Sequence, residues 1–432
     1  MKIDYNLDGY SYLTDDTSKI DKDTQFLLTA QNQKYFEQLE DKPSFVTPIN
    51  LISKLGLNSL KVVGVTGTNG KTTVTAAIYS FLLDLNKKVA LQGTRGFFVN
   101  EQRVQEKIMT TPSILETINH MIVAKERGCE YFVMEVSSHA IDQNRIEGLK
   151  FALKVHTNVT SDHLDYHKTV EEYRAVKSRF FADESPKLLN KDDIKNITYN
   201  PKNAQSYGVD EPATFKVQAF SLNDGIVAGV KHLREEATFS SPMVGLFNLF
   251  NLMASISSVV ILTGKKLQEV CDVVPNFAGV AGRMEVVSTN PLVIVDFAHT
   301  DDGMVQVLDS MKDRDVVVVF GAGGDRDRTK RARMGAVASK FAKKVFVTSD
   351  NPRSEDPAQI IKDILSGIKD QSNTRAMVDR AFAIQEALKG LKDNEVLMIL
   401  GKGDEDYMEI NGEKIHFDDR EIVRLLLEEM NN

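Results

Sequence analysis

The chain has 432 residues, 42% apolar and 26% charged, which is enough for two or three globular domains with buried cores. A net charge of −8 argues against non-specific binding to nucleic acid or anionic lipid. Two cysteines, Cys129 and Cys271, cannot form a disulfide framework or a cysteine-based metal site. Neither a signal peptide nor a membrane span is predicted, so we expect a cytoplasmic protein.

The predicted elements begin clearly only after residue 60. From there, short apolar runs alternate with stretches of helical spacing, as in βαβ units around a mostly parallel sheet. Shorter strands are predicted within 190–240, then a helix over 246–264 and a glycine-containing linker over 279–286. A second series of apolar runs follows, each ending in small or polar residues. We therefore predict an α/β protein with domains at 1–59, 60–283 and 284–432.

The segment "VVGVTGTNGKTT", residues 62–73, joins a predicted strand to a helix that begins near Lys71. Backbone N–H groups and the positive helix end favour a polyphosphate there. Lys71 would reach the terminal phosphates, and a hydroxyl of Thr72 or Thr73 would bind Mg²⁺. Val65 stands where the strict P-loop pattern has glycine, and an ordinary β–α turn is the alternative. The predicted ATP loop comprises Gly67, Thr68, Asn69, Gly70, Lys71, Thr72 and Thr73.

"GVTGTNGKTT" resembles the ATP loop of the Mur ligases, the ATP-dependent amide ligases of peptidoglycan precursor synthesis. Further motifs of the family follow in order: "TTPS" (110–113), "MEVSSHA" (134–140), "TNVTSDHLDYH" (157–167), "YRAVKSRFF" (173–181), "FNLFN" (247–251), "GVAGRME" (279–285), "DFAHT" (296–300), "GAGGDRD" (321–327), "DNPRSEDP" (350–357) and "GKGDE" (401–405). The resemblance implies a short N-terminal UDP-substrate-binding domain, a central P-loop parallel-sheet ATPase domain and a C-terminal Rossmann-like domain that binds an amino acid. It is strongest to members that add meso-diaminopimelate to UDP-N-acetylmuramoyl-L-alanyl-D-glutamate, through an acyl phosphate.

The resemblance also implies the catalytic groups. Glu135 and His163 match ligands of a second Mg²⁺, although an acid at a strand end or a lone histidine is often only structural. Lys177 stands at the position where the family carries a carbamylated lysine. Burial or a cationic neighbour would lower its pKa and free the amine to capture CO₂. The alternative is a helix-surface lysine paired with Glu172 or Asp183.

Further residues match the family's binding positions for ATP and the acceptor. Arg283 would reach the γ-phosphate, and Asn251, Asp296 and His299 would lie around the base and ribose. The acceptor, a UDP-linked dipeptide, would contact Thr110, Thr111, Ser137, Gln143 and Arg145, with Thr17 and Ser18 near the uridine. Threonines before "PSILETINHM" could instead serve only as a turn or helix cap. Partners are expected to be these small molecules alone, with the chain a monomer.

The predicted diaminopimelate site follows from "DNPR". Diaminopimelate differs from lysine by a second carboxylate, which the planar fork of Arg353 would bind through two hydrogen bonds. Asp350 and Asn351 would receive the ammonium group. By resemblance the full set is Arg326, Asp350, Asn351, Pro352, Arg353, Gly401 and Glu405. An ordinary Asn-Pro turn is the alternative.

The sequence departs from the family pattern at several positions. The N-terminal segment is short, and the family's usual Ser-Arg is present only as "DDTSKID". Asp404 and Ala322 stand where histidine and cysteine are usual. Three alternatives remain: a folate polyglutamate ligase or another Mur ligase, a P-loop nucleotide switch that would not need Glu135, His163 and Lys177 together, and a non-catalytic ATP-binding scaffold.

Overall fold

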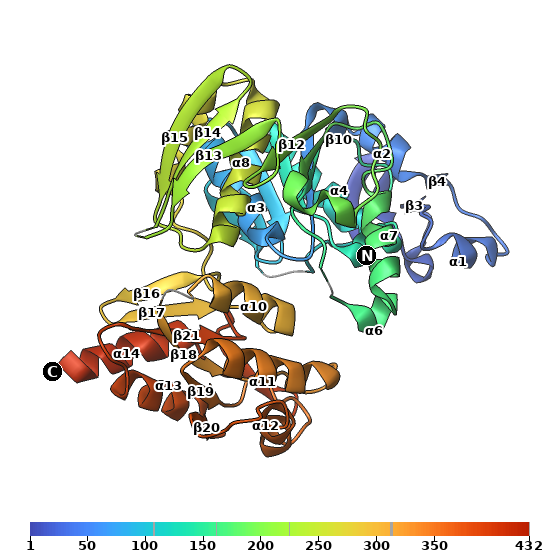
Figure 1. Cartoon of the computed structure of the whole chain (residues 1–432). Helices are drawn as coiled ribbons and strands as arrows, with labels where there is room; N and C mark the ends of the chain where they lie inside the picture. Colours follow the sequence, from blue (N-terminus) through green and yellow to red (C-terminus); the bar gives the residue numbers. More distant parts are fainter. Residues whose placement is uncertain (107–108, 161, 224, 312–313, 432) are drawn as a thin grey trace. The chain divides into compact units, whose positions relative to one another are not determined.

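The structure, a computed structural model, describes residues 1–106, 109–160, 162–223, 225–311 and 314–431. The chain forms two compact units (Figure 1). The first unit comprises 1–221, 227–241 and 249–277, and the second comprises 222–226, 242–248 and 278–432. The first 59 residues fall within the first unit, so the three predicted domain boundaries stay a prediction.

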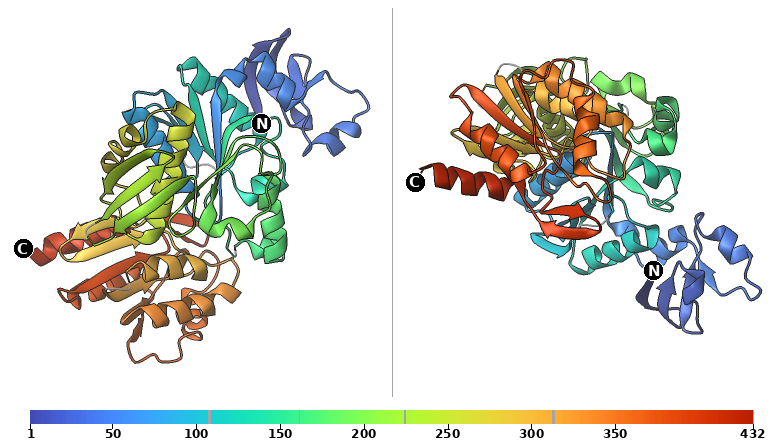
Figure 2. Two further views of the ribbon diagram at one scale, coloured as in Figure 1. Left: turned by 45° about the horizontal axis from the view of Figure 1, so that its top comes forward. Right: turned by 90° about the horizontal axis from the view of Figure 1, so that it is seen from below.

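A small four-stranded sheet opens the first unit, seen in dark blue in Figure 2. Its strands are β1 (Lys2–Leu7), β2 (Tyr10–Thr14), β3 (Thr24–Leu27) and β4 (Phe45–Val46), in that order, and its helices are α1 (Gln33–Glu37) and α2 (Pro48–Lys54). Proline suits the first turn of α2, where its missing N–H costs nothing. Leu13, Leu27 and Leu51 join these elements to the core of the unit.

The main sheet of the first unit has eleven strands in the order β15-β14-β13-β12-β11-β10-β5-β9-β6-β7-β8. Its strands are β5 (Lys61–Thr66), β6 (Val89–Gly93), β7 (Gly96–Val99), β8 (Gln102–Gln105), β9 (Tyr131–Glu135), β10 (Phe151–His156), β11 (Lys187–Asn190), β12 (Ala204–Gly208), β13 (Phe215–Ser221), β14 (Ile226–His232) and β15 (Glu235–Ser241). Strand β5 pairs in parallel with β10 and β9, and its five C-terminal residues are buried. Continuous apolar runs such as "KVVGVT" are typical of such strands, which are covered on both faces.

The helices of the first unit are α3 (Lys71–Asp84), α4 (Ile114–Glu126), α5 (Ser138–Asp142), α6 (Leu164–His167), α7 (Val170–Arg179), α8 (Leu246–Thr263) and α9 (Leu267–Cys271), of which α8 begins in the second unit. Helix α8 confirms the helix predicted over 246–264. By length and composition alone α8 could cross a membrane, but 72% of its apolar window is buried inside the protein. A buried core helix accounts for that composition.

The second unit is a three-layer α/β structure. Its six-stranded sheet runs β16-β17-β21-β18-β19-β20, parallel except for β16, with bounds β16 (Glu285–Thr289), β17 (Leu292–Asp296), β18 (Asp315–Phe320), β19 (Lys344–Val347), β20 (Thr374–Ala376) and β21 (Glu395–Leu400). Side chains of α10 (Asp301–Asp309), α11 (Thr329–Phe341) and α12 (Pro357–Leu365) form one core, and those of α13 (Arg380–Lys389) and α14 (Asp419–Asn431) form another. A hairpin, β22 (Tyr407–Ile410) and β23 (Glu413–His416), follows β21. The predicted α/β fold class is confirmed.

Candidate active site

The predicted ATP loop lies between the end of β5 and the start of α3, as expected. Gly70 caps α3 with a φ of 84°, a conformation that favours glycine. Gly67 is pressed against the neighbouring strand end: a Cβ there would lie 1.8 Å from Thr157 Oγ1. Thr157 Oγ1 also donates to the carbonyl of Asn69 at 2.6 Å. The loop is therefore held closely against the segment that follows β10.

We expect Gly67→Ala to weaken ATP binding about tenfold, because the added methyl group must push the loop away from Thr157 at a cost of about 1.4 kcal/mol or more. Isothermal titration with a non-hydrolysable ATP analogue measures this. Gly229→Ala is the matched control, since a Cβ there meets nothing nearer than 4.0 Å. An unchanged dissociation constant in Gly67→Ala would contradict the loop assignment.

Hydrogen bonds hold the loop and place its lysine. Thr68 N donates to the Asn158 carbonyl at 2.7 Å, and Asn69 N donates to Asn158 Oδ1 at 3.0 Å. Lys71 Nζ lies back over the loop, 2.9 Å from the carbonyl oxygens of Gly67 and Thr68. The ammonium group thus stands at the mouth of the turn, where a polyphosphate would be received.

A buried carboxylate lies beside the start of α3. Glu135, at the end of β9, is 1% exposed and accepts Thr72 Oγ1 at 3.0 Å and Thr94 N at 2.8 Å. Thr73 is also buried, on the same helical turn as Thr72. A hydroxyl and a carboxylate this close are the oxygen donors that suit Mg²⁺ beside a nucleotide. The donor set therefore fits the predicted metal.

Lys177 is a buried lysine directly against the ATP loop. It is 1% exposed on α7, and its Nζ donates to the Gly67 carbonyl at 2.9 Å. The Tyr173 ring lies beneath the amine, 4.9 Å away. Burial, and secondarily the Lys71 charge, hold the pKa of Lys177 well below its usual range. The alternative of a surface lysine is therefore wrong, and the neutral amine is the form that such a site favours.

His163 is placed differently. Its side chain is 46% exposed, its Nε2 lies 3.4 Å from Asp162 Oδ2, and its ring lies 4.9 Å from that of His139. Within the described ranges, no three His, Cys, Asp or Glu side chains form a group that could hold a metal. The assignment of Glu135, His163 and Lys177 to one metal cluster stays a prediction.

Three of the predicted acceptor residues lie around the end of β9. Thr111 Oγ1 donates to the Glu135 carbonyl at 2.9 Å and accepts Ser137 N at 3.0 Å. Thr110 Oγ1 lies 3.1 Å from Thr94 Oγ1, which also lies 3.3 Å from Glu135 Oε2. Ser137 caps α5, and Ser113, rather than either threonine, caps α4. These residues are therefore linked to Glu135, whose carboxylate also bonds to Thr72 beside the ATP loop.

Gln143 and Arg145 complete this group. Arg145 Nη1 donates to the Thr111 carbonyl at 2.9 Å, and its Nε and Nη2 donate to Gln143 Oε1 at 3.0 and 2.6 Å. Thr17 and Ser18 lie elsewhere, in a short 3-10 helix of the N-terminal sheet region, where Ser18 bonds to Asp16. Among the contacts of the described residues, none links Thr17 or Ser18 to the other five predicted acceptor residues.

The remaining ATP residues are divided between the units. Asn251 is buried on α8 in the first unit, and a Cβ on Gly70 would lie 2.4 Å from its Oδ1. Asp296 ends β17 in the second unit, accepts the backbone N–H groups of Met284 and Ala298 at 2.7 Å each, and has its pKa raised by burial. In the same unit Arg283 stacks over Phe297 at 4.4 Å, and His299 Nδ1 lies 2.9 Å from the Phe297 carbonyl. Arg283, Asp296 and His299 thus gather at one sheet edge.

All of the predicted diaminopimelate residues lie in the second unit, just beyond the carboxyl ends of β18, β19 and β21. Asn351 is 3% exposed, and its Nδ2 donates to Glu405 Oε2 at 2.8 Å. Asp350 approaches Gly401 so closely that a Cβ on the glycine would lie 2.5 Å from its Oδ2. Burial raises the pKa of Glu405, and Asp350 adds to that effect. Three acidic or amide side chains therefore lie close together at this edge of the sheet.

Arg353 lies beside this group with a φ of 52°. Its Nη1 donates to the Gly324 carbonyl at 2.7 Å. A Cβ added to Gly323 would lie 3.0 Å from this Nη1 and 3.8 Å from Arg326 Cγ. The Pro352 carbonyl packs directly against Gly324, where an added Cβ would lie only 1.9 Å from its oxygen. Arg353 thus packs against the glycine-rich turn that carries Arg326.

Lys402, which no sequence motif singled out, is fully buried at the centre of this group. Its Nζ donates to Asn351 Oδ1 at 3.2 Å, to Glu405 Oε2 at 3.4 Å and to the Tyr407 carbonyl. Thr94 and Tyr173 were missed in the first unit. The only signal for Lys402 in the sequence was its place within "GKGDE". A lysine in a glycine-containing turn is usually exposed, so this signal did not indicate a buried residue.

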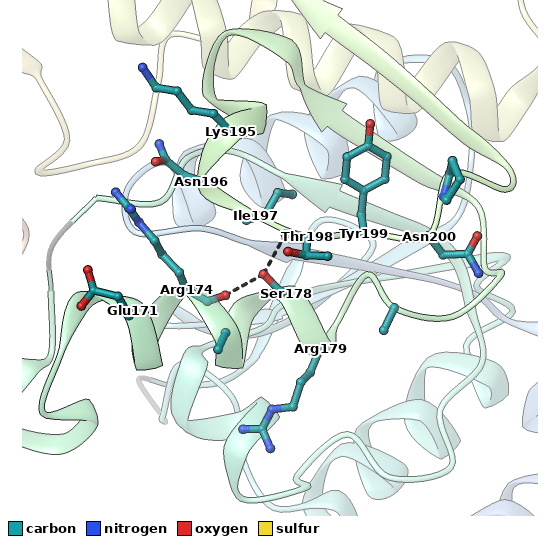
Figure 3. Close-up of a pocket in the computed structure, with 13 residues that line it drawn as sticks. Glu171, Arg174, Ser178, Arg179, Lys195, Asn196, Ile197, Thr198, Tyr199 and Asn200 are labelled. Atoms are coloured by element: carbon teal, nitrogen blue, oxygen red, sulfur yellow. Dashed lines mark hydrogen bonds between the residues drawn. The ribbon is translucent and has the colours of Figure 1, made fainter.

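A cavity of about 880 Å³ opens beside α7 (Figure 3), and Lys177 is not among the residues that line it. Helix α7 and residues 195–201 line it, and Ser178 links the two by accepting Thr198 N at 3.0 Å. It contains none of the predicted site residues. This cavity is therefore separate from the candidate active site.

Comparison with known proteins agrees with this geometry. Residues 65–259 match the Mur ligase middle domain, and residues 282–403 match the Mur ligase, glutamate ligase domain. The chain is 50% identical to the UDP-N-acetylmuramoyl-L-alanyl-D-glutamate--2,6-diaminopimelate ligase of Wolinella succinogenes, over 100% of this chain and 99% of the relative. It is 47% identical to the ligase of the same name from Helicobacter pylori, over 98% and 97%. The chain belongs to the Mur ligase family.

A solved structure of a UDP-N-acetylmuramoyl-L-alanyl-D-glutamate--2,6-diaminopimelate ligase is also similar, with a TM-score of 0.69, 29% identity and coverage of 97% of this chain and 95% of that one. This Mur ligase is therefore an ATP-dependent ligase with the three-domain architecture of its family. The nucleotide-switch and scaffold alternatives are not supported. The roles of individual site residues stay predictions.

Proposed function

We propose that this Mur ligase joins meso-2,6-diaminopimelate to UDP-N-acetylmuramoyl-L-alanyl-D-glutamate at the expense of ATP, in the cytoplasm and as a monomer. The observation that carries the proposal is identity of 47–50%, along essentially the whole chain, to relatives named for this reaction. The acidic and arginine side chains around Asn351 support it, because diaminopimelate offers an ammonium group and a distal carboxylate.

The reaction requires that the acceptor carboxylate be phosphorylated and that the amine then attack the acyl phosphate. Both steps concentrate negative charge, which the positive charge of the Lys71 ammonium and of the N-terminus of α3 stabilises. Mg²⁺, which Thr72 or Thr73 and Glu135 would hold, supplies further charge neutralisation. Thr111, Gln143 and Arg145 would orient the acceptor beside this point, and orientation itself lowers the barrier.

We propose further that Lys177 carries a carbamate. Its burial against the Gly67 carbonyl and its lowered pKa support this, since only the neutral amine can bond to the carbon of CO₂, with loss of one proton. The product is a carboxylate on a long stem, which would act beside the ATP loop together with Glu135 and His163.

The direct test is phosphate release with ATP, the acceptor and a panel of amines: diaminopimelate, lysine and glutamate. We expect release with diaminopimelate to exceed that with lysine by about 10³-fold or more in kcat/KM, because lysine leaves the Arg353 site unpaired. Comparable efficiency with lysine would contradict the substrate assignment. A preference for glutamate would favour the folate polyglutamate alternative.

A further inference from the structure

We propose that Glu409 is a positioning residue that fixes the Arg353 guanidinium for the distal carboxylate of the amine substrate. This inference rests on the proposed function, in which Arg353 binds diaminopimelate. Glu409 lies on β22, in the hairpin that follows the "GKGDE" segment. Neither its position in the sequence nor a site motif singles it out.

The backbone of Glu409 first holds the loop that carries Arg353. Arg353 N donates to the Glu409 carbonyl at 2.9 Å, and Asn411 N donates to the Arg353 carbonyl at 2.8 Å. Glu409 N in turn donates to Asn351 Oδ1 at 2.9 Å. Arg353 has a φ of 52°, which is unfavourable for a residue with a Cβ atom. Pairing with β22 on both sides of Arg353 therefore maintains that conformation.

The Glu409 side chain then restricts the guanidinium. Arg353 Nε donates to Glu409 Oε2 at 3.1 Å, while Nη1 donates to the Gly324 carbonyl at 2.7 Å. Because these two hydrogen bonds are donated from different sides of the planar guanidinium, they fix the orientation of its plane. The two side chains are 23% and 27% exposed, so the pair is partly screened from water.

The remaining donors of Arg353 define what it can bind. A guanidinium has five N–H groups, and two are used by Glu409 and Gly324. Within the part of the chain that the structure describes, Nη2 makes no hydrogen bond. Glu409 occupies Nε, so the side-on pair of Nε and Nη2 cannot bind a carboxylate, and two-pronged binding must use the end-on pair of Nη2 and the Nη1 proton that Gly324 does not accept. That pair matches one carboxylate through two parallel hydrogen bonds.

The experiment compares Glu409→Gln and Glu409→Ala with the wild type in amine-dependent phosphate release by the full chain. We expect the KM for diaminopimelate to rise about tenfold, with kcat changed by less than about twofold, because the guanidinium loses its orientation before the chemical step. Glu413→Gln, on the paired strand β23, removes the same charge from an exposed position and is expected to leave both constants unchanged.

A double-mutant cycle separates positioning from a general structural effect. In the Arg353→Lys background, Glu409→Gln is expected to have no further effect on kcat/KM, because the fork that it orients is gone. An equal loss in both backgrounds, or a lower KM in Glu409→Gln, overturns the inference. If the wild type itself releases no phosphate with diaminopimelate, the proposed function fails, and this inference fails with it.

Discussion

Lys177→Ala is expected to lower the ligase rate by about 10³-fold or more, because it removes both the buried amine and the carbamate proposed on it. Excess bicarbonate is expected to restore nothing, since no amine remains to capture CO₂. Short carboxylates such as acetate or formate, which fit the space left by the side chain, are expected to restore part of the rate. Steady-state phosphate release measures all three.

Lys187→Ala is the matched control for this variant. Lys187 is also 1% exposed, on β11, but its Nζ donates to the carbonyls of Asp183 and Lys202, away from the ATP loop. It tests whether loss of any buried lysine inactivates the enzyme through misfolding, which thermal melts of both variants monitor. Full activity in Lys177→Ala would disprove the catalytic role.

Arg353→Lys is expected to lower kcat/KM for diaminopimelate by about 10²- to 10³-fold while leaving ATP binding intact. Lysine keeps the positive charge but cannot present two parallel donors to a carboxylate, and its amine has no equivalent of the bond to Gly324. The efficiency with diaminopimelate should approach that with lysine as substrate. Steady-state kinetics with both amines measure this.

Arg375→Lys serves as the control, because Arg375 is exposed and pairs only weakly with Glu386 at 3.3 Å. It lies on β20, and none of its contacts reaches the "DNPR" loop. An undiminished preference for diaminopimelate in Arg353→Lys would show that another group recognises the distal carboxylate. Arg326, on the neighbouring glycine-rich turn that Arg353 contacts, would then be the first candidate.

The resemblance to the Mur ligases, carried by motifs in order along the chain, pointed to residues that the structure brings together. The predicted ATP loop, Glu135 and Lys177 lie together, and "DNPR" and "GKGDE" meet at one sheet edge, because the carboxyl ends of parallel strands converge there. The buried environment of Lys177 could not be predicted from spacing alone. Tyr173 lies on the preceding turn of α7, but Gly67 lies on the ATP loop, far away in the sequence. Only tertiary packing brings that loop against Lys177.

The sequence alone determined the α/β fold class and the Mur ligase resemblance, which in turn implied the chemistry of the reaction, because strand and helix periodicities and the order of motifs are local properties of the chain. The tertiary structure alone decided which side chains are desolvated and paired. It placed Lys402 among Asn351 and Glu405, and it set Glu409 against Arg353. Burial and hydrogen-bond geometry depend on elements far apart in the sequence, and no local pattern encodes them.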